Sequence, residues 1–469
     1  MKESYITTAI PYVNGNPHLG HTMDYLLADT LRRYMTYCGK KVRLQAGTDE
    51  HGSKNFKKAA EQGIPVQDFV DQKAQIYQDF IHSLGVEYTD FVRTTDPDHE
   101  RRCQEIWRKL SDHIYKDKYE GWYCEGCEGY VTEKEYNENH GECPDHKKPY
   151  TKLSEENYYL RISDFKSRIR EAIESDELKI TPAFRKKELL NMLKDMPDVS
   201  ISRPRAQVQW GIPVPDDDEQ VMYVWIDALS NYITVLGYPD KDISADWPAH
   251  TQIVGKDILR FHAGIWPAIL MGLGLPLPRN LLAHGWITAN GEKMSKTIGN
   301  VIDPQEIIGK HGLAPFRYYF LRHASTTTDA DFTWEKYEAS YNELANDLGN
   351  LVQRLATLCK KNDISGQKVE RVTNEDFDRR MEKYEFNFAF DILWDGIAEL
   401  NKRIDAEKPW ALAKSDPEKA KKVLVKLVVD LLSINDRLQI FLPDVSAKIQ
   451  DIFTATEIQP PATPLFPKN

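Results

Sequence analysis

Two short segments, far apart in the chain, carry side chains suited to phosphate chemistry. In the first, His18 and His21 lie three residues apart at the start of a periodic apolar pattern that is typical of a helix. At this spacing both imidazoles face the same way on the first helical turn, where backbone N–H groups and the helix dipole attract anions. Gly20 lies between them and has no Cβ that would block a close ligand. Histidines near a helix start are more often caps or surface residues, so this segment alone is a weak signal.

The second segment, residues 291–297, contains Lys293 and Lys296 on either side of Met294 and Ser295. Two ammonium groups on a loop led by a glycine can close on a triphosphate and stabilise the pyrophosphate that leaves. Lysine pairs in loops are usually solvated surface. Phosphate chemistry is therefore indicated by the two segments together and not by either one alone.

A third group of residues has the spacing of metal ligands. Cys124 and Cys127 form a C-x₂-C pair, and Cys143 and His146 form a C-x₂-H pair. Four such ligands favour a closed, tetrahedral site for one structural Zn²⁺. The polar stretch between the pairs has no core of its own, so the metal would supply much of its folding energy. Unligated cysteines are the alternative, and a redox C-x-x-C would need a thioredoxin-like context that this segment lacks.

A strand–helix–strand unit would position the histidine pair. Residues 4–10 are β-branched and aromatic, residues 18–38 have helical periodicity, and residues 42–46 alternate like a second strand. Polar residues, including Asp49, collect just after both strands. In an open parallel sheet, ligands bind beyond the carboxyl ends of the strands, so the sequence predicts a ligand site at this edge.

The whole chain predicts an α/β protein with a Rossmann-like parallel sheet, an inserted zinc-knuckle connective domain and a C-terminal α-helical bundle. Strand-like alternation resumes at residues 221–226, 251–254 and 280–286, and long amphipathic helices follow at 341–361 and 417–441. The expected divisions are 1–115 and 221–280 for the halves of the catalytic domain, 116–220 for the insertion with the knuckle at about 121–150, 281–335 for the lysine-loop region, and 336–469 for the helical domain.

The composition is that of a globular protein that stays out of the membrane. The net charge of −11 argues against a basic coat for nucleic acid, although a large partner can still be held by a local basic face. The longest apolar stretch, residues 263–278, contains three prolines and is shorter than the ~20 residues that a membrane span requires. No apolar leader precedes Pro11, and the six cysteines do not form a dense disulfide framework. We therefore expect a cytoplasmic protein.

The histidine and lysine segments together resemble the HIGH and KMSKS signatures of the class I aminoacyl-tRNA synthetases. The family grips ATP with histidines and lysines, which agrees with the absence of a glycine-rich phosphate loop. The resemblance sharpens to the methionyl-tRNA synthetases and covers essentially the whole chain, through residues 9–15, 47–52, 121–124, 224–229, 255–262, 285–286 and 293–296. His146 departs from the commonest pattern, since many relatives have a fourth cysteine there.

The resemblance implies a ligase that activates L-methionine with ATP to methionyl-adenylate and pyrophosphate, and then transfers methionyl to the terminal adenosine of tRNA(Met), initiator or elongator. It implies that ATP with Mg²⁺ binds His18, Gly20, His21, Lys293 and Lys296, the histidines and lysines being catalytic. The implied methionine pocket comprises Ala9, Ile10, Tyr12, Asp49, Trp225, Ala228, Leu229, Tyr232, Ile258 and His262. Aromatic walls suit a polarisable thioether, and Asp49 would pair with the substrate ammonium. Taken singly, such aromatic residues more often fill a core.

By the same resemblance, an Asn, an Arg and a Trp of the helical domain read the CAU anticodon, and the best match is Asn350, Arg354 and Trp410. Asn350 and Arg354 share one helix face, and Trp410 can stack an unpaired base. Asn346 competes for the Asn role, and an ordinary solvated helix face is the alternative. The C-terminal dimerising module of some relatives is absent here, so we expect a monomer.

Other functions fit parts of this pattern. The isoleucyl, valyl and leucyl enzymes insert a larger editing domain, and a cysteinyl enzyme would place zinc in its catalytic pocket. The small HIGH-type nucleotidyltransferases would not need the helical domain. The non-enzyme alternative is a zinc-knuckle RNA-binding protein descended from a synthetase, and the intact histidine and lysine pairs argue against it.

Overall fold

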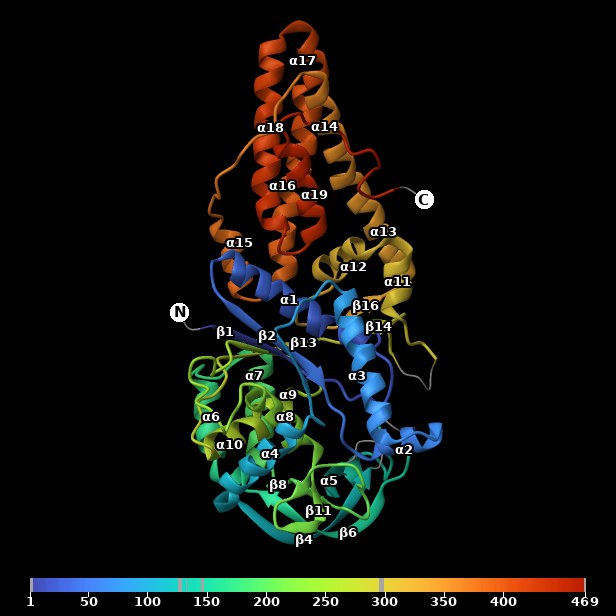
Figure 1. Ribbon diagram of the computed structural model, residues 1–469, viewed down its shortest axis with the longest axis vertical. Coiled ribbons are helices and arrows are strands. Elements are labelled where there is room, and N and C mark those ends of the chain that lie inside the picture. Colours follow the sequence, from blue (N-terminus) through green and yellow to red (C-terminus); the bar gives the residue numbers. More distant parts are fainter. Residues whose placement is uncertain (1–2, 125–128, 132, 145–146, 295–298, 468–469) are drawn as a thin grey trace.

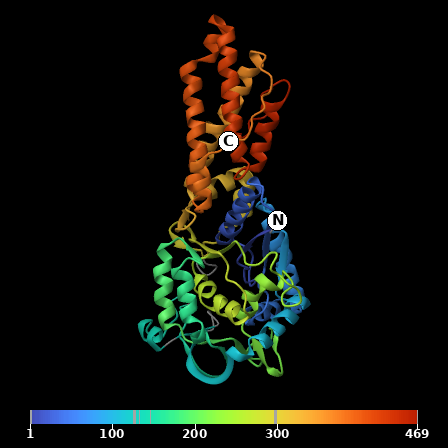
Figure 2. The same cartoon turned by 90° about the vertical axis from the view of Figure 1, so that its left-hand side faces the viewer.

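The computed structural model describes residues 3–124, 129–131, 133–144, 147–294 and 299–467. Figure 1 and Figure 2 show an elongated molecule in which an α/β part occupies one end and a bundle of helices extends from it along the long axis. Within these ranges, no helix has both the length and the apolar character that crossing a bilayer requires.

A six-stranded parallel sheet forms the centre of the α/β part, in the order β3-β2-β1-β12-β13-β7. This confirms the predicted Rossmann-like sheet. The chain runs outward in one direction from β1 to β3 and in the other from β12 to β13, so the order reverses between β1 and β12. Ligands bind at such a reversal, beyond the carboxyl ends of the strands. The strands are β1 (Ser4–Thr8), β2 (Val42–Thr48), β3 (Asp90–Arg93), β7 (Lys179–Thr181), β12 (Thr251–Gly255) and β13 (Asn280–His284).

The sheet separates two hydrophobic cores, because successive side chains of a strand point to opposite faces. Ile6 of β1 belongs to one core and its neighbour Tyr5 to the other; Ile253 and Val254 of β12 divide in the same way. Helix α1 (Thr22–Tyr37) covers the first face. The second face is covered by α8 (Val224–Thr234), α10 (Ile265–Gly272) and α6 (Lys166–Glu174).

The segment that follows the third strand builds a separate antiparallel sheet. It centres on a long pair, β4 (Ile114–Cys124) and β6 (Thr151–Leu160), flanked by β5 (Gly129–Val131) and β8 (Val199–Ser200). The expected insertion, residues 116–220, nevertheless returns to the main sheet within its length, since β7 pairs with β13. Three residues are too few for a periodic signal, and only the pairing partner defines this strand. The remaining elements here are α5 (Glu133–Glu138), α7 (Phe184–Asp195), β9 (Ser202–Pro204), β10 (Pro213–Val214) and β11 (Asp217–Met222).

The strand predicted at residues 221–226 is wrong in its second half. Strand β11 ends at Met222, and helix α8 begins at Val224. Every residue from Ile226 to Thr234 is buried, so this helix has no solvent-exposed face. A short apolar run such as residues 221–226 does not distinguish a strand from a buried helix, and the polar residues that recur at helical spacing come only after it, at Asp227, Ser230, Asn231 and Thr234.

The lysine-loop region and the helical part complete the chain. The helix predicted at 341–361 is interrupted by a π-helical turn, Ala345–Gly349, which separates α13 (Trp334–Leu344) from α14 (Asn350–Lys361). The helix predicted at 417–441 is α18 (Pro417–Leu438). The other elements are α2 (Ser53–Gln62), α3 (Val66–Ser83), α4 (Pro97–Lys109), α9 (Leu259–Ala263), β14 (Ile287–Ala289), β15 (Glu292–Lys293), α11 (Pro304–His311), α12 (Leu313–Tyr318), β16 (Ala330–Phe332), α15 (Glu375–Glu382), α16 (Phe386–Glu407), α17 (Pro409–Ser415) and α19 (Pro443–Thr454).

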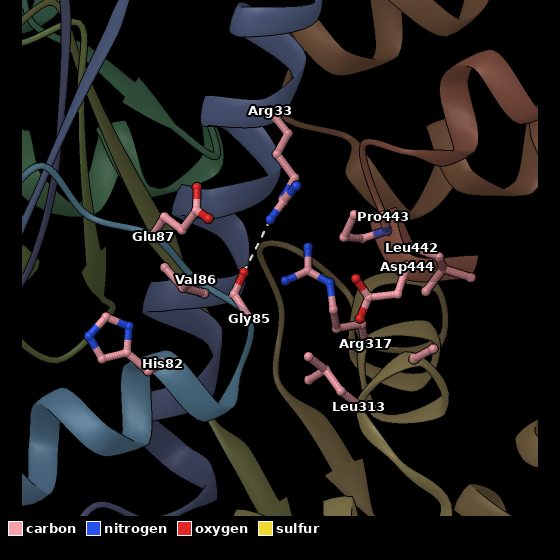
Figure 3. A pocket seen from close by; sticks show the side chains of 11 residues that line it. Arg33, His82, Gly85, Val86, Glu87, Leu313, Arg317, Leu442, Pro443 and Asp444 are labelled. Atoms are coloured by element: carbon pink, nitrogen blue, oxygen red, sulfur yellow. Dashed lines mark hydrogen bonds between the residues drawn. The ribbon is translucent and has the colours of Figure 1, made fainter. Parts of the chain in front are cut away.

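A buried charged junction joins the two parts. Arg317 of α12 donates to the carbonyl of Leu84 (3.2 Å) and to that of Phe441 (2.8 Å), and it pairs with Asp29 of α1 at 2.9 Å. Burial raises the pKa of Asp29, but the guanidinium groups of Arg317 and Arg33 hold it below its ordinary value. These arginines line a cavity of about 400 Å³ between α1, α12 and the start of α19 (Figure 3). The junction fixes the helical part to the helix that follows the histidine pair.

Candidate active site

A short 3₁₀ turn, Leu19–His21, presents the histidine pair at the start of α1. Nδ1 of His18 accepts from the N–H of Gly20 at 3.0 Å, and Nδ1 of His21 accepts from the N–H of His18 at 3.1 Å. The ring centroids are 4.1 Å apart. Because each Nδ1 acts as an acceptor, this geometry assigns the ring proton to Nε2 in both residues. Both imidazoles are thus prepared as hydrogen-bond donors for phosphate oxygens.

The lysine segment meets this turn, as the sequence predicted. The N–H of Leu19 donates to the carbonyl of Ile302 at 3.2 Å. A Cβ added to Gly20 would lie 2.8 Å from Cε1 of His18 and 3.9 Å from Cε of Met294, so a side chain here would displace the His18 ring and would contact Met294. The predicted residues Ser295, Lys296 and Thr297 lie outside the described residues. For the part that is described, two segments far apart in sequence converge on one place.

Lys293 stands on a hairpin whose turn, Asn290 and Gly291, has two positive φ angles (54° and 81°). This combination is the one that a tight two-residue hairpin requires. The Lys293 ammonium lies 4.1 Å from the centroid of the Trp286 ring, and the Lys256 ammonium lies 4.0 Å from the same centroid. The Lys256 ammonium is also paired with the Asp329 carboxylate at 2.6 Å, so Lys293 is the cation of this pair that the sequence predicts to bind a polyanionic ligand.

One half of the predicted methionine pocket lies at the ends of β1 and β2. Tyr12 and Asp49 form an isolated parallel bridge, and the N–H of Asp49 donates to the carbonyl of Pro11 at 2.9 Å. Gly52 has φ +106°, and a Cβ there would lie 2.3 Å from the hydroxyl of Tyr12. Ala9, next to Ile10, donates from its N–H to the carbonyl of Ile253 at 2.9 Å. The loop 49–52 thus holds Asp49, a residue that is 93% buried, beside Tyr12.

The other half comes from α8 and α9. The hydroxyl of Tyr232 lies 2.7 Å from Nε2 of His262, and Nδ1 of His262 lies 3.1 Å from the carbonyl of Ile258. Burial lowers the pKa of His262 to about 4, so the ring is neutral, Nδ1–H donates to the carbonyl and Nε2 accepts from the tyrosine. Trp225 stacks on Phe261 with centroids 3.7 Å apart. Ala228 and Leu229 are buried on the same helix.

A buried polar network that the sequence analysis did not single out links these two halves. Asp227 of α8 lies 2.7 Å from Nδ1 of His51 and 2.8 Å from Nε2 of His99 on α4. The remaining ring nitrogen of His99 lies 2.7 Å from the hydroxyl of Thr234, at the end of α8. His51 and Asp227 occur within the stretches 47–52 and 224–229 that carry the family resemblance, but His99 gave no sequence signal that separates it from a core histidine.

The described ligands of the predicted zinc site are buried in one small cluster. Cys124 at the end of β4 and Cys143 are each at least 97% buried, and both pack with Tyr150. The N–H of Lys147 donates to the carbonyl of Cys143 at 2.8 Å, which turns the chain back just after this residue. Cys127 and His146 lie outside the described residues. Two buried sulfurs on a sheet end and a tight turn fit the thiolate half of a structural zinc site.

Two of the three residues predicted to read an anticodon meet on the helical part. The Arg354 guanidinium lies 4.9 Å from the centroid of the Trp410 ring, and Trp410 is 42% exposed. Arg354 also pairs with Asp405 at 2.6 Å. Asn350 and its competitor Asn346 are both exposed, so which of them has the role stays open. An arginine over an exposed indole forms a platform on which an unpaired base can stack.

Comparisons with known proteins agree with one another. The family model "tRNA synthetases class I (M)" matches residues 4–152 and 145–356. The chain is 37% identical to a methionine–tRNA ligase of Caldanaerobacter subterraneus over 97% of its length and 74% of that protein, and 37% identical to one of Rickettsia bellii over 95% and 92%. The Mycobacterium tuberculosis methionyl-tRNA synthetase in complex with methionyl-adenylate matches over 100% of both chains, at 31% identity and a TM-score of 0.91. Its apo form matches with a TM-score of 0.85 at 29% identity, over 100% of this chain and 98% of that one.

Proposed function

This chain belongs to the class I aminoacyl-tRNA synthetases of the methionyl type, and we propose that it activates L-methionine with ATP and then esterifies tRNA with the methionyl group. The observation that carries the proposal is that the histidine turn meets Met294 of the lysine segment, beside Gly20, and Ile302 just after that segment, which bonds Leu19. A histidine pair and an ammonium group around one cleft suit the phosphates of a nucleotide.

In the first step, the methionine carboxylate attacks the α-phosphate of ATP, the bond to the β-phosphate breaks, and methionyl-adenylate and pyrophosphate form. The chain contributes mainly positioning and charge stabilisation to this kind of reaction. The Nε2–H groups of His18 and His21 would donate to the phosphate oxygens, whose charge grows in the transition state. Lys293 and Lys296 would hold the triphosphate together with the Mg²⁺ that accompanies ATP.

Methionine itself would lie between the two halves of its pocket. Asp49 would accept hydrogen bonds from the substrate ammonium, and its burial strengthens that pairing. Trp225 and Tyr232 would contact the thioether, which makes favourable contacts with aromatic rings. Since His262 is neutral and donates to the Ile258 carbonyl, this ring brings no positive charge that would compete with the ammonium.

In the second step, the terminal adenosine of the tRNA takes the methionyl group and AMP leaves. The anticodon would be read on the helical part by Arg354, Trp410 and Asn350, with initiator and elongator tRNA(Met) as substrates. One Zn²⁺ would be held by Cys124, Cys127, Cys143 and His146, where it supplies folding energy and takes no part in the chemistry. We further propose a monomer that works in the cytoplasm, organised in the domains that the sequence predicts except that strand β7, within residues 116–220, belongs to the main sheet.

Methionine-dependent exchange of pyrophosphate into ATP tests this proposal. We expect exchange that requires methionine, and for Lys296→Ala a fall in its rate of ~10²–10³-fold with the KM for methionine little changed. The reason is that Lys296 acts on the triphosphate and not on the amino acid. A wild-type protein without methionine-dependent exchange would overturn the function, and a defect confined to the methionine KM would overturn the role of Lys296.

A further inference from the structure

We propose that Asp227 is a positioning residue for methionine recognition, whose buried carboxylate fixes helix α8 against the loop that carries Asp49. Asp227 bonds His51, which lies two residues after Asp49, and it lies two residues after Trp225 and one before Ala228. The two halves of the pocket thus meet through one carboxylate. This inference rests on the proposed function, because it concerns the same substrate.

The loop 49–52 is already fixed on its other sides. The Glu50 carboxylate accepts two hydrogen bonds from Arg93, each 2.8 Å long. The indole N–H of Trp210 donates to the carbonyl of Glu50 at 2.9 Å, and the N–H of Gly52 donates to the carbonyl of Trp210 at 2.9 Å. The loop is therefore a rigid base, and the position of α8 relative to it depends on what joins the two.

Asp227 supplies that link near the start of α8, and His99 extends it to the end of the helix. His99 bonds Asp227 through Nε2 and Thr234 through Nδ1, so both ends of the helix are held by side chains of α4 and of the loop. All three residues of the network, His51, His99 and Asp227, are at least 97% buried. A small displacement of α8 would move Trp225, Ala228 and Tyr232 away from Asp49 together.

The network is an ion pair and not a set of neutral contacts. Burial lowers the pKa of His51, but the charge and hydrogen bond of Asp227, with Glu100 on the other side at 3.3 Å, raise it to about 10. Burial raises the pKa of Asp227, and its bonds to His51 and His99 hold it below its ordinary value nonetheless. An amide at position 227 would keep the shape but lose the charge, and one partner would face a donor instead of an acceptor.

The same place has a rival interpretation as a metal site. The ligand atoms of His99, Cys103 and Asp227 lie within 4.8 Å of one another. Burial and the Asp227 charge raise the pKa of the Cys103 thiol well above its ordinary value, which favours the protonated thiol over the thiolate that a metal needs. Asp227 already accepts hydrogen bonds from both histidines, and these bonds explain why the residues lie so close together. Metal content is therefore one outcome of the test.

The test compares Asp227→Asn with the wild type in steady-state pyrophosphate exchange. We expect the KM for methionine to rise by about 10- to 100-fold, because the displacement of one wall of the pocket weakens the binding of methionine by about this factor. The KM for ATP and the kcat at saturating methionine should stay within about threefold, since the phosphate end is untouched. If Asp227→Asn does not fold, His51→Gln removes the same ion pair from the other side and is expected to give the same split.

Asp90→Asn is the matched control. Asp90 holds Arg43 with two hydrogen bonds of 2.6 and 2.8 Å at the opposite, amino-terminal end of β2. The substitution removes an ion pair between β2 and β3 without touching the pocket, so the KM for methionine should not change. A rise in the methionine KM of this control that equals the rise in Asp227→Asn would show a general loss of stability and would overturn the inference.

A spectroscopic measurement separates positioning by an ion pair from a merely structural role. In ¹⁵N-histidine NMR spectra at about pH 8.5, about two units above the ordinary histidine pKa, the signal that disappears in His51→Gln should be that of a doubly protonated ring. In Asp227→Asn the same ring should be singly protonated. A neutral His51 in the wild type would overturn the inference, even if the KM changes.

The remaining outcomes are also decisive. If Cys103→Ser loses one equivalent of bound metal and raises the methionine KM, the network is a metal site and the inference is wrong. If both KM values and kcat are unchanged in Asp227→Asn while only its melting temperature falls, the network is structural and the inference is wrong. Absence of methionine-dependent exchange in the wild type would instead overturn the proposed function, while the NMR measurement still reports on the ion pair.

Discussion

The two ends of the proposed active site are built in opposite ways. At the methionine end, buried side chains bond one another: Tyr232 with His262, and Asp227 with two histidines. At the phosphate end, His18 and His21 are only partly buried and are oriented by backbone N–H groups. In the function that we propose, a closed network would thus meet the apolar side chain of methionine, and half-exposed donors on a turn would meet the polyanionic ATP.

The difference has a physical reason. A buried network is strong only when every member is satisfied, so it fixes one geometry and one protonation state. This suits the selection of a small apolar side chain, for which shape is the main source of discrimination. The triphosphate changes its charge and geometry during the reaction, and donors near solvent on a turn and a hairpin can follow it. The two ends should therefore fail in different ways when they are mutated.

The largest effect expected from this comparison is on rate. His21→Ala should lower the exchange rate at saturating substrates by ~10²–10³-fold, which is ~2.7–4 kcal/mol, because one preorganised donor to the transition state is lost. Trp225→Ala, its counterpart at the methionine end, should instead raise the methionine KM and leave kcat within about threefold. Steady-state kinetics with both substrates varied would check this. If kcat and the methionine KM changed in the same way in both variants, the proposed difference between the two ends would be wrong.

The second effect is on the pH dependence of stability. With a folded pKa of about 4 against an ordinary value of about 6.5, His262 takes up a proton in the unfolded chain before it does in the folded one. Stability from this group is thus present above pH 6.5 and lost as the pH falls toward 4. Between pH 7 and pH 5 the loss should be about 2 kcal/mol. His51, with its raised pKa, is protonated in the folded state throughout this range and contributes in the opposite direction, between pH 6.5 and 10.

Urea denaturation of the wild type and of His262→Gln at pH 5 and pH 7 measures this effect. The variant should lose about 2 kcal/mol less than the wild type between the two values, because the residue that titrates is gone. The difference between the proteins removes the contribution of all other groups. An identical pH dependence in the variant would show that His262 is not held neutral.

The smallest effect is expected far from the cleft. Trp410→Ala should weaken tRNA binding by about tenfold, the loss of one stacked base, and leave methionine-dependent exchange without tRNA unchanged. Phe388→Ala is the matched control, because Phe388 is also an exposed aromatic residue of the helical part, with the Arg380 guanidinium 5.3 Å from its ring centroid. If Phe388→Ala weakens tRNA binding as much, the assignment of Trp410 is wrong.

Much of the site could be predicted because its residues stand in short, unusual stretches. The turn at His18 and the hairpin at Lys293 have local signals, namely turn formers and a helix start, that do not depend on the rest of the fold. Helix α8 was wrongly predicted as a strand in its first residues, because the short apolar run 221–226 does not distinguish a strand from a buried helix. Strand β7 was missed because three residues become a strand only through their pairing with β13.

The sequence by itself determined which chemical groups are available, and it predicts that two distant segments share one ligand. It did so because residue types at fixed local spacings set the chemistry of each segment. The tertiary structure alone decided the charge of the buried histidines. His51 is charged and His262 is neutral, although both are buried and both lie near the same pocket. The difference comes from their partners: Asp227, 176 residues from His51, supplies a carboxylate, whereas Tyr232 and the Ile258 carbonyl offer His262 only neutral groups.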